Sequence, residues 1–561
     1  MASPNENFDL ETKILDYTTI ENKAVKSQET TIIFNPETDN LETEVTPTPV
    51  PEENQFPPPG IWSNKKVSVQ ALHATGLSVE ETEYAALGGG MGSFVWVDTI
   101  RIYGVKPDQI VVLGIESKPY ARYKTLTGNS QIPLHERIRS GSDSCPDNIW
   151  GWPGYALREA WGETFRRGRL NRTIGLLWQV FAEPALADTY TPKLGNVFDS
   201  LDREAERISW DRMWRYGAIR SIRQTEDGRY AIAYSRSTEQ RREHRFLIAR
   251  YVHLAMGYPA IRFLPDLQAY RATTGDFKSV VNAYEQHEHI YNHLIRNGGK
   301  VVVRGRGIVA SRVIQRLYEV RQQNPQVSII HLMRSPKPEG DKFEFSQRYA
   351  ENQWEFQPYN WPKGTWGGDM RSRLEAASPT ERYKLLKAWD GTTTASRSDW
   401  RKMINDGLKE GWYTIAFGQV QRVERSTNGK PLTYITTNQG EIKVEADFII
   451  DSTGLEAKPD ANPLLKDLIN HYNLPLNPFG RLDVANDFEM LQMRNDRSRM
   501  YASGVMTLGG PYAPVDTFLG LQYAAQRSAD ALVRSRAAKI HYLDGLGSLI
   551  QWIKWATNQN P

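Results

Sequence analysis

Apolar and polar positions alternate along this chain in blocks that predict strands and helices in turn. The first clear block is a short apolar run at residues 82–87 (TEYAAL), which a glycine-rich turn at residues 88–93 brings to an end. The next segment, FVWVDTIRIYGV, has helical length and an apolar stripe, and a second apolar run at residues 110–115 (IVVLGI) follows it. We therefore expect a strand, a glycine turn, a helix and a parallel strand.

The same order of elements recurs later in the chain. An apolar run at residues 300–303 (KVVV) leads into a second glycine turn at residues 304–310 (RGRGIVA), and a helical segment at residues 311–323 follows. Another strand is expected at residues 327–333 (VSIIHLM). Two such units in one chain predict two nucleotide folds of the α/β class.

A three-stranded meander accompanies each unit. Its hairpins are predicted at an Asp-Gly pair (227–228) in the first copy and an Asn-Gly pair (428–429) in the second, because such dipeptides favour tight turns. The strand-like runs cover residues 217–223, 229–235 and 244–259 in the first copy, and residues 413–425, 431–437 and 441–454 in the second. This duplication predicts an α/β fold with two Rossmann-like dinucleotide-binding domains, each with an inserted three-stranded antiparallel meander.

Composition supports a chain of more than one domain. With 561 residues, 40% hydrophobic and 24% charged, it has ample material for two cores. Lys and Arg (69) nearly balance Asp and Glu (66), so the net charge of +3 gives no overall electrostatic case for nucleic acid or an anionic membrane. Any such partner has to be argued locally. No stretch has the length and apolarity of a transmembrane span, and no signal-peptide pattern opens the chain, which favours a cytoplasmic location.

Cys145 is the only cysteine in the sequence. A single thiol excludes an intramolecular disulfide framework and a multi-cysteine zinc site. It also excludes the Cys-x-x-Cys pair on which a dithiol reductase depends.

The two glycine turns carry the candidate chemistry. In a strand–turn–helix unit, the first glycine permits a sharp exit from the strand, the second lets the backbone approach a pyrophosphate, and the third allows close packing of helix on strand. Gly88-x-Gly90-x-x-Ser93 and Gly305-x-Gly307-x-x-Ala310 fit this pattern, with a small residue in each third place. Two matches, each between a strand and a helix, favour two nucleotide sites over two packing turns.

The residues after the second strand of each unit indicate which nucleotide each unit binds. Glu116 follows the strand of the first unit, where a carboxylate can accept hydrogen bonds from ribose hydroxyls. Arg334 stands at the equivalent place in the second unit, with Lys337 close behind. A cation there suits a 2′-phosphate, which favours NADPH over NADH.

The order of these elements resembles the two-dinucleotide-binding-domain flavoproteins, which bind FAD and NAD(P)H. The likeness covers roughly residues 61–532 and includes the strand ends Leu-Ala-Met-Gly and Asp-Ser-Thr-Gly. It implies that the first turn holds FAD, that the second holds NADPH, and that Gly257 and Gly454 mark the crossings between domains. By position, the FAD residues would be Gly88, Gly89, Gly90, Gly92, Ser93, Glu116 and Gly504, and the NADPH residues Gly305, Gly307, Ala310 and Arg334.

The resemblance also implies a discontinuous FAD domain. The expected divisions are an acidic, proline-rich tail and linker (1–60), the first segment of the FAD domain (61–280), an NAD(P) domain (281–445) with an aromatic-rich insertion at about 336–410, the second segment of the FAD domain (446–538), and a C-terminal amphipathic helix (539–561). The tail is predicted to be disordered, as either a solvated extension or a docking arm for another protein.

Within this superfamily the chain looks more similar to the N-hydroxylating flavin monooxygenases than to the disulfide reductases. Disulfide reductases typically carry Gly-Asp after the last strand, whereas Val505 follows Gly504 here. The terminal helix also starts after a longer loop, as in the N-hydroxylating branch. The histidine-containing linker signature of the Baeyer–Villiger and dimethylaniline-type monooxygenases is not found.

Four other features of the sequence are less specific. The aromatics of the insertion could form a lid or pocket over a flavin, or a small satellite core beneath a long loop, and the Trp150–Pro153 cluster poses the same choice. His289 and His293 could share a helix face, yet without a third ligand a solvated helix end is preferred and no metal is expected. The arginine-rich run at residues 236–245 is expected to be a solvated hairpin.

Together these features predict an FAD-dependent, NADPH-oxidising oxidoreductase, and possibly a monooxygenase, that acts on an unidentified small molecule. Because the cofactors would carry the chemistry, no catalytic side chain stands out. The alternative is a flavin-binding scaffold or regulatory protein without turnover.

Overall fold

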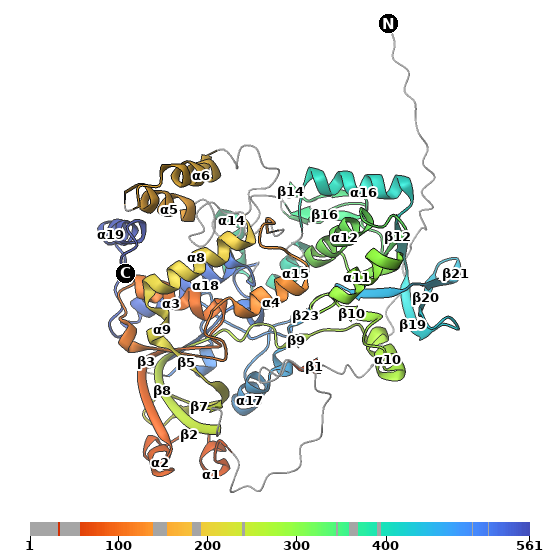
Figure 1. Cartoon of the computed structure of the whole chain (residues 1–561). Coiled ribbons are helices and arrows are strands. Elements are labelled where there is room, and N and C mark those ends of the chain that lie inside the picture. Colours follow the sequence, from red (N-terminus) through yellow and green to blue (C-terminus); the bar gives the residue numbers. More distant parts are fainter. Residues whose placement is uncertain are drawn as a thin grey trace.

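The computed structural model describes most of the chain after the N-terminal region (Figure 1). The described residues are 32–33, 56–138, 154–165, 167–181, 192–237, 242–343, 346–357, 368–389, 394–495, 498–513 and 515–561.

The first domain is built on a parallel sheet with the order β24-β8-β3-β4-β5. Its strands are β3 (Ser78–Leu87), β4 (Ile110–Gly114), β5 (Trp214–Tyr216), β8 (Arg242–Leu254) and β24 (Arg499–Ala502). Side chains at the end of β3 are buried on alternate faces of the sheet: Tyr84 and Ala86 pack in one core cluster, and Ala85 and Leu87 pack in another. The sheet therefore lies between two apolar layers. The first layer contains α3 (Met91–Ile102), α8 (Leu194–Ile208) and α18 (Phe518–Arg534), and the second contains α17 (Pro463–Tyr472).

The second domain repeats this plan. Its parallel sheet has the order β10-β22-β11-β12-β18, and Val301 and Val303 face a different core cluster from Val302. The strands are β10 (Val280–Asn282), β11 (Gly299–Arg304), β12 (Val327–Met333), β18 (Tyr413–Phe417) and β22 (Phe448–Asp451), and the helices beside them are α11 (Glu288–Asn297), α12 (Ile308–Arg321) and α16 (Ser398–Glu410). The two sheets match strand for strand, which confirms two Rossmann-like domains in one chain.

Both predicted meanders are present. They are formed by β6 (Ala218–Thr225), β7 (Tyr230–Ser237) and β8 in the first domain, and by β19 (Gln419–Arg425), β20 (Pro431–Thr437) and β21 (Gly440–Glu445) in the second. Figure 1 shows the second meander projecting from the edge of its domain. The single strand expected at 413–425 is divided at Gly418 into β18, which pairs with β12, and β19, which pairs with β20. Gly418 has φ +150°, and a Cβ there would lie 2.4 Å from Ile435, so the division needs a glycine.

The sheet topology moves one expected boundary. β22 lies between β10 and β11, so the second domain extends beyond residue 445 to Asp451. Chain connectivity between the domains runs through β9 (Ala260–Ile261) and β23 (Leu455–Glu456), which pair with each other.

The tail expected at residues 1–60 contains one described strand. Ile32 and Ile33 form β1, which pairs antiparallel with β9, so these two residues are not part of a structureless tail. Two β-branched apolar residues suit the edge of a small sheet, which is the physical reason for this correction. Residues 1–31 and 34–55 lie outside the described residues.

The aromatic-rich insertion contributes to the core of the second domain. Trp354 and Phe356 are buried in the same cluster as Val301, which supports the packing interpretation for these two rings. Tyr359, Trp361, Trp366 and residues 150–153 lie outside the described residues. The insertion contains β13 (Lys342–Phe343), β14 (Ser346–Gln347), β15 (Tyr349–Glu351), β16 (Trp354–Gln357), β17 (Thr394–Ala395), α14 (Gly368–Ala376) and α15 (Pro379–Trp389).

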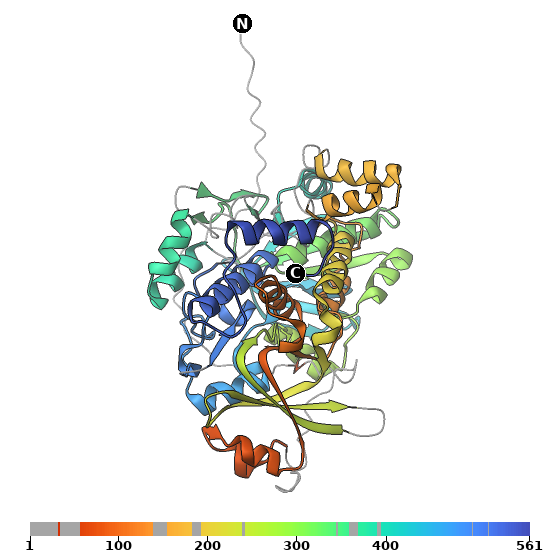
Figure 2. The same ribbon diagram turned by 90° about the vertical axis from the view of Figure 1, so that its left-hand side faces the viewer.

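The remaining helices and short elements complete the fold (Figure 1 and Figure 2). They are α1 (Pro59–Trp62), β2 (Lys66–Val67), α2 (Val69–Ala74), α4 (Ala121–Asn129), α5 (Gly154–Phe165), α6 (Leu170–Phe181), α9 (Trp210–Met213), α10 (Pro265–Thr274) and α19 (Gly545–Ala556). The amphipathic helix expected at 539–561 is thus α19. Among the residues that the structure describes, none of the helices has the length and apolarity to span a bilayer.

Candidate functional site

The first glycine turn begins directly after β3, where neighbouring backbone leaves no room for a side chain at Gly88. Gly88 has φ +122°, and a Cβ there would lie 2.3 Å from the carbonyl oxygen of Ala255, so no other residue fits without a shift of the backbone. Gly90 is different, because the nearest atom to its Cβ position is the carbonyl oxygen of Pro119 at 3.9 Å. The fold therefore requires Gly88, while the space beside Gly90 is open.

Ser93 has a structural role in place of the usual third glycine. Its hydroxyl accepts a hydrogen bond from the Gly89 N–H at 3.2 Å and lies 3.4 Å from the Leu87 carbonyl oxygen. Close packing falls instead to Gly92, where a Cβ would lie 2.7 Å from the Cβ of Ala255. The serine hydroxyl thus links the start of α3 to the glycine turn through a hydrogen bond.

The second glycine turn has the same construction. Gly305 has φ +121°, and a Cβ there would lie 2.5 Å from the carbonyl oxygen of Ser452, while Gly307 has open space around its Cβ position. Ala310, in the third place, is fully buried. A cavity of about 410 Å³ lies over this turn and is lined by Tyr284, residues 305–309 and residues 452–454.

Both turns end at helix N-termini that have no side-chain cap. Within the described structure, no side chain caps the first turns of α3 and α12, whose N-cap residues are Gly90 and Gly307. Other described helices, such as α10 and α11, also lack a side-chain cap, whereas side chains cap α17, α18 and α19. What distinguishes α3 and α12 is that their uncapped N–H groups follow a glycine turn. Uncapped N–H groups at the positive end of a helix dipole suit a phosphate.

One buried serine hydroxyl lies beside each turn, although the two serines follow different strands of their sheets, Ser452 after β22 and Ser503 after β24. Ser452 is the residue whose carbonyl approaches Gly305, and the hydroxyl of Ser503 lies 3.2 Å from the Cβ position of Gly92. In the described part of the chain, both hydroxyls are buried without a hydrogen-bond partner. A buried hydroxyl without a partner is costly, so each is suited to bond a ligand. The donors and the open space at each turn fit a dinucleotide.

The two crossing glycines and Gly504 follow strand ends, as expected from the sequence. Gly257 and Gly454 each come three residues after the end of a sheet strand, β8 and β22, and both have positive φ. Gly504 follows β24 and lies near Leu521 of α18.

Glu116 is half-buried just beyond β4. Burial raises the pKa of its carboxyl, and the nearby Arg122 guanidinium opposes that shift. Arg122 also donates a hydrogen bond to the carbonyl oxygen of Tyr258, which ties α4 to the domain crossing. Arg122 was not predicted from the sequence, although a cation near the start of the following helix is a signal that could have found it.

Arg334 lies immediately beyond β12 and is exposed. Lys337 is less available, because its ammonium group lies 2.6 Å from the Asp341 carboxylate. The structure adds Arg306, which the sequence analysis missed although it stands between the two glycines of the turn. Its Nε lies 3.3 Å from the sulfur of Met333, and its guanidinium donates to the Ser335 carbonyl oxygen. Two guanidinium groups therefore lie near the end of β12.

A chain of buried hydrogen bonds ends at the carbonyl oxygen of Gly305 in the second turn. The Nε2 of His331 lies 2.5 Å from the Gly305 carbonyl oxygen, and its Nδ1 lies 2.7 Å from the Tyr413 hydroxyl. Trp354 Nε1 donates to the same hydroxyl at 3.2 Å. Burial lowers the pKa of His331 to about 4, so the ring is neutral and Nε2–H is the donor to Gly305. The insertion thus helps to hold the nucleotide turn.

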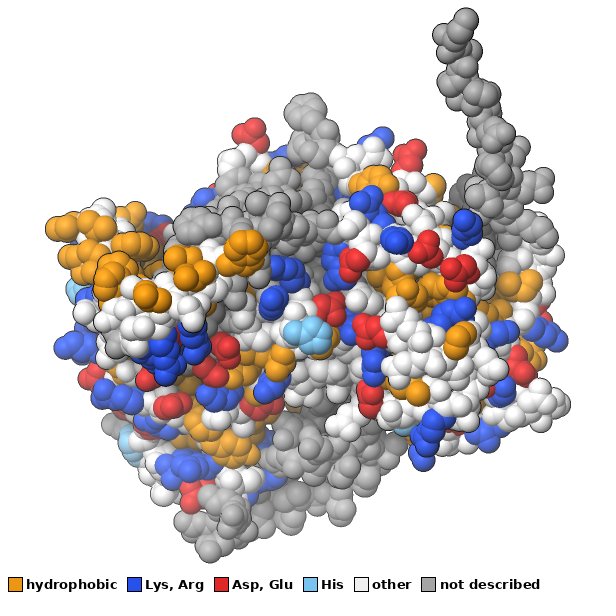
Figure 3. Space-filling model, turned by 45° about the horizontal axis from the view of Figure 1, so that its top comes forward, with side chains coloured by type: hydrophobic (Ala, Val, Ile, Leu, Met, Phe, Trp, Pro, Cys, Tyr) orange, Lys and Arg blue, Asp and Glu red, His pale blue; other side chains and the backbone are white. Residues whose placement is uncertain are grey.

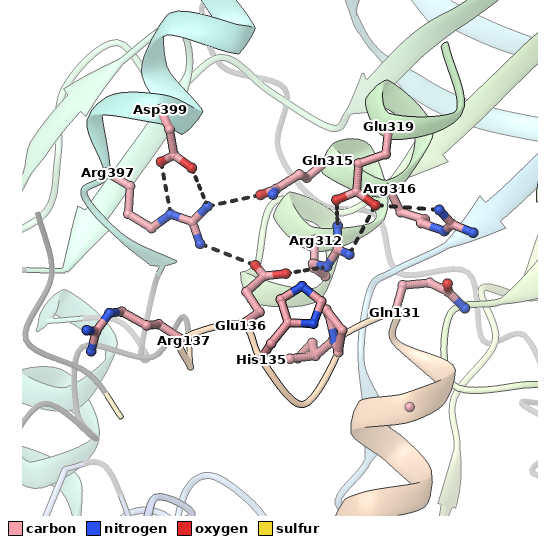
Figure 4. Close-up of a pocket in the computed structure, with 13 residues that line it drawn as sticks. Gln131, His135, Glu136, Arg137, Arg312, Gln315, Arg316, Glu319, Arg397 and Asp399 are labelled. Atoms are coloured by element: carbon pink, nitrogen blue, oxygen red, sulfur yellow. Dashed lines mark hydrogen bonds and ion pairs between the residues drawn. The ribbon is translucent and has the colours of Figure 1, made fainter. Parts of the chain in front are cut away.

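A second cavity, of about 820 Å³, lies between the two domains (Figure 4). Glu136, which follows α4 of the first domain, lies 3.0 Å from Arg312 and 3.3 Å from Arg397 of the second. Arg312 also pairs with Glu319, and Arg397 with Asp399. All five side chains line the cavity, and Glu136 connects the two domains through them.

We expect Glu136→Gln to weaken the contact between the domains by about 1–3 kcal/mol, because it removes the carboxylate charge between two largely buried guanidinium groups. Thermal unfolding and limited proteolysis measure the effect. Glu288→Gln is the control, since it breaks an exposed pair with Arg316 that is worth at most about 1 kcal/mol. Equal small losses in both variants would contradict the role of Glu136.

His287, His289 and His293 have different surroundings in the structure. His287 is buried and bonds the Glu285 carbonyl and the Tyr291 hydroxyl, while His289 and His293 are exposed. No group of three or more His, Cys, Asp or Glu residues suited to a metal occurs in the described ranges.

The comparisons with known proteins place the fold. No family model matches the sequence, and no curated protein matches it either. Solved structures do match it: an ornithine hydroxylase from Pseudomonas aeruginosa (TM-score 0.56, 15% identity, 81% of this chain and 100% of that chain) and an ornithine N-hydroxylase from Kutzneria sp. 744 with reduced FAD, NADP⁺ and L-ornithine (TM-score 0.58, 13% identity, 81% and 100%).

A third match is a cadaverine monooxygenase from Erwinia amylovora bound to FAD, with a TM-score of 0.57, 11% identity, and coverage of 82% of this chain and 96% of that chain. At such low identities the likeness concerns the fold. This protein therefore has the two-dinucleotide-domain fold of these ornithine hydroxylases and the cadaverine monooxygenase.

Proposed function

We propose that this protein is an FAD-dependent NADPH oxidoreductase of the monooxygenase kind. The observation that carries the proposal is the duplicated turn: in each domain a backbone carbonyl closes on the first glycine, an uncapped helix begins, and a buried serine hydroxyl has no partner among the described residues. Two turns of this construction in one chain suit two dinucleotides.

Each cofactor has its own set of residues in this proposal. FAD would be held by the turn at residues 88–93 together with Glu116, Ser503 and Gly504. NADPH would be held by the turn at residues 305–310 together with Ser452, Arg306 and Arg334. The N–H groups of α3 and α12 would bind the pyrophosphates, and Glu116 would accept hydrogen bonds from a ribose.

The chemistry supplied by the bound cofactors is hydride transfer from the nicotinamide to the flavin and electron transfer onward to dioxygen or another small acceptor. The protein's own role is to bind and orient them. Because the solved structures of similar fold are named for ornithine and cadaverine, we propose small primary amines as the first substrate class to test.

Stopped-flow mixing with NADPH tests this proposal. Purified protein loaded with FAD is mixed anaerobically with NADPH, and the flavin absorbance is followed. Bleaching within seconds, followed by recovery on admission of oxygen, is the result expected of an oxidoreductase. A persistent oxidised spectrum would contradict the proposal and favour the flavin-binding scaffold.

Arg334→Ala is expected to weaken NADPH binding by roughly tenfold to a hundredfold and to leave NADH nearly unchanged. The reason is the loss of a bidentate, charge-assisted contact with the 2′-phosphate, worth about 1.5–3 kcal/mol. Titration of each nucleotide, followed by fluorescence, measures both affinities. Lys409→Ala, which removes an exposed cation on α16 of the same domain, is the control. Equal losses for both nucleotides would assign Arg334 a structural role.

A further inference from the structure

Three peripheral helices carry apolar side chains that face solvent. On α6, Leu170, Ile174 and Trp178 recur at every fourth position, and all are more than half exposed. On α5, Trp161 and Phe165 are likewise exposed, and their rings lie 4.4 Å apart. This spacing forms one stripe along each helix.

The stripe on α19 is wider. Leu546, Leu549, Ile550 and Ile553 occupy one side of the helix, Trp552 lies beside them, and no residue of the helix is fully buried. Exposed aliphatic and aromatic residues at this density are rare on a monomeric protein surface and mark an interaction site.

The three helices lie together on the molecule. The Arg158 guanidinium of α5 lies 5.2 Å from the centre of the Trp555 ring of α19, and Figure 1 shows α5, α6 and α19 in one corner of the structure. Figure 3 shows orange side chains gathered in that region. We call the exposed stripes of these three helices the apolar face.

The charge near the apolar face is positive, although the whole chain is nearly neutral. Arg167, Arg169 and Arg172 are exposed at the turn between α5 and α6. Both acids of α5 are paired with arginines: Glu159 lies 2.9 Å from Arg203, and the buried Glu163 lies 2.7 Å from Arg167 and 3.8 Å from Arg172. Lys554 is the only charged residue of α19.

We propose that the apolar face binds the surface of a membrane that contains anionic lipids. Trp and aliphatic side chains would enter the headgroup boundary, and the arginines would contact lipid phosphates, as in interfacial amphipathic helices. Each helix has 12 residues and a length of about 18 Å, too short to cross a hydrocarbon core of about 30 Å, so the helices would lie on the membrane. Cationic charge favours this surface over an apolar protein partner.

Vesicle flotation with the full-length protein tests the proposal. We expect the protein to float with vesicles of phosphatidylcholine containing about 30% phosphatidylserine, and less with phosphatidylcholine alone. Ile174→Glu and Leu549→Glu should each reduce flotation about tenfold, because a charge replaces an apolar contact. Arg169→Glu should selectively reduce binding to the anionic vesicles. Ile442→Glu, at an exposed position on β21 of the second domain, is the matched control and should float like the wild type.

Three outcomes would overturn the proposal. One is the absence of flotation with either vesicle, and another is an equal loss in Ile442→Glu. The third is a dimer on size-exclusion chromatography that Ile174→Glu converts to a monomer without any vesicle binding, since that would assign the face to a contact between two copies of the chain. Arg169→Glu changes only an exposed charge, so it keeps the test valid if an apolar variant fails to fold. None of these results depends on flavin binding.

Discussion

Replacement of Gly90 by Val is expected to give a folded protein that binds no FAD. The backbone at Gly90 is extended, with φ −89°, and the nearest atom to its Cβ position is 3.9 Å away, so the protein itself tolerates a side chain there. That open space is where the second glycine of such a turn lets a pyrophosphate approach. A valine would fill it, and the yellow colour of the purified protein should be abolished.

Absorbance near the flavin maximum and far-ultraviolet circular dichroism together measure this result. Gly88→Ala is the contrasting variant, because its Cβ would lie 2.3 Å from the Ala255 carbonyl oxygen and its φ is strained for any side chain. It should therefore lower the unfolding temperature as well as flavin content. A Gly90→Val protein that retains its flavin would contradict the assignment of FAD to the first turn. A wild-type protein that remains colourless with excess FAD would contradict it as well.

Acidification from pH 8 to pH 5 is expected to destabilise the first domain by about 2 kcal/mol through His253 alone. Burial lowers the pKa of His253 to about 3, whereas an unfolded histidine titrates near 6.5. Between these two pKa values the imidazole of His253 is protonated in the unfolded chain and neutral in the folded protein. The stabilisation is therefore complete above pH 6.5 and is lost as the pH falls.

His253→Phe isolates this effect. The imidazole stacks on Trp96 with ring centres 5.0 Å apart, and a phenyl ring can keep that contact without titrating. Unfolding at pH 8, 6.5 and 5 should show a pH dependence in the variant that is about 2 kcal/mol shallower than in the wild type. Parallel profiles for the two proteins would mean that His253 is protonated or solvated in the native state.

The local pattern of the sequence predicted which elements form, but not always which sheet they join. The strand expected at residues 327–333 is β12 itself, and both hairpin turns occur where Asp-Gly and Asn-Gly were found. An alternating run does not record the point at which a strand leaves one sheet for another, which is why the division at Gly418 was missed. The assignment of β22 failed for a similar reason, since its partners β10 and β11 lie far away in the sequence.

In the candidate site, too, local features were predicted from the sequence and long-range contacts were not. Glycine spacing predicted both turns, because the positive φ of Gly88 and Gly305 belongs to the local conformation of each turn. His331 and Ser503 were not predicted, because they act through residues distant in sequence: His331 bonds the Gly305 carbonyl, and Ser503 lies beside Gly92. Their positions depend on how the strands pair.

The pairing of β9 with β23 has a mechanical consequence for the two domains. The chain leaves the first domain through residues 260–261 and returns through residues 455–456, and these segments are bonded side by side as an antiparallel ribbon. A single connecting strand can twist freely, whereas two bonded strands resist torsion and bend mainly across their plane. We therefore expect the domains to move relative to each other mainly about one hinge axis. The addition of β1 to the edge of this ribbon widens it to three strands, and we expect the loss of Ile32 and Ile33 to make the connection between the domains easier to bend.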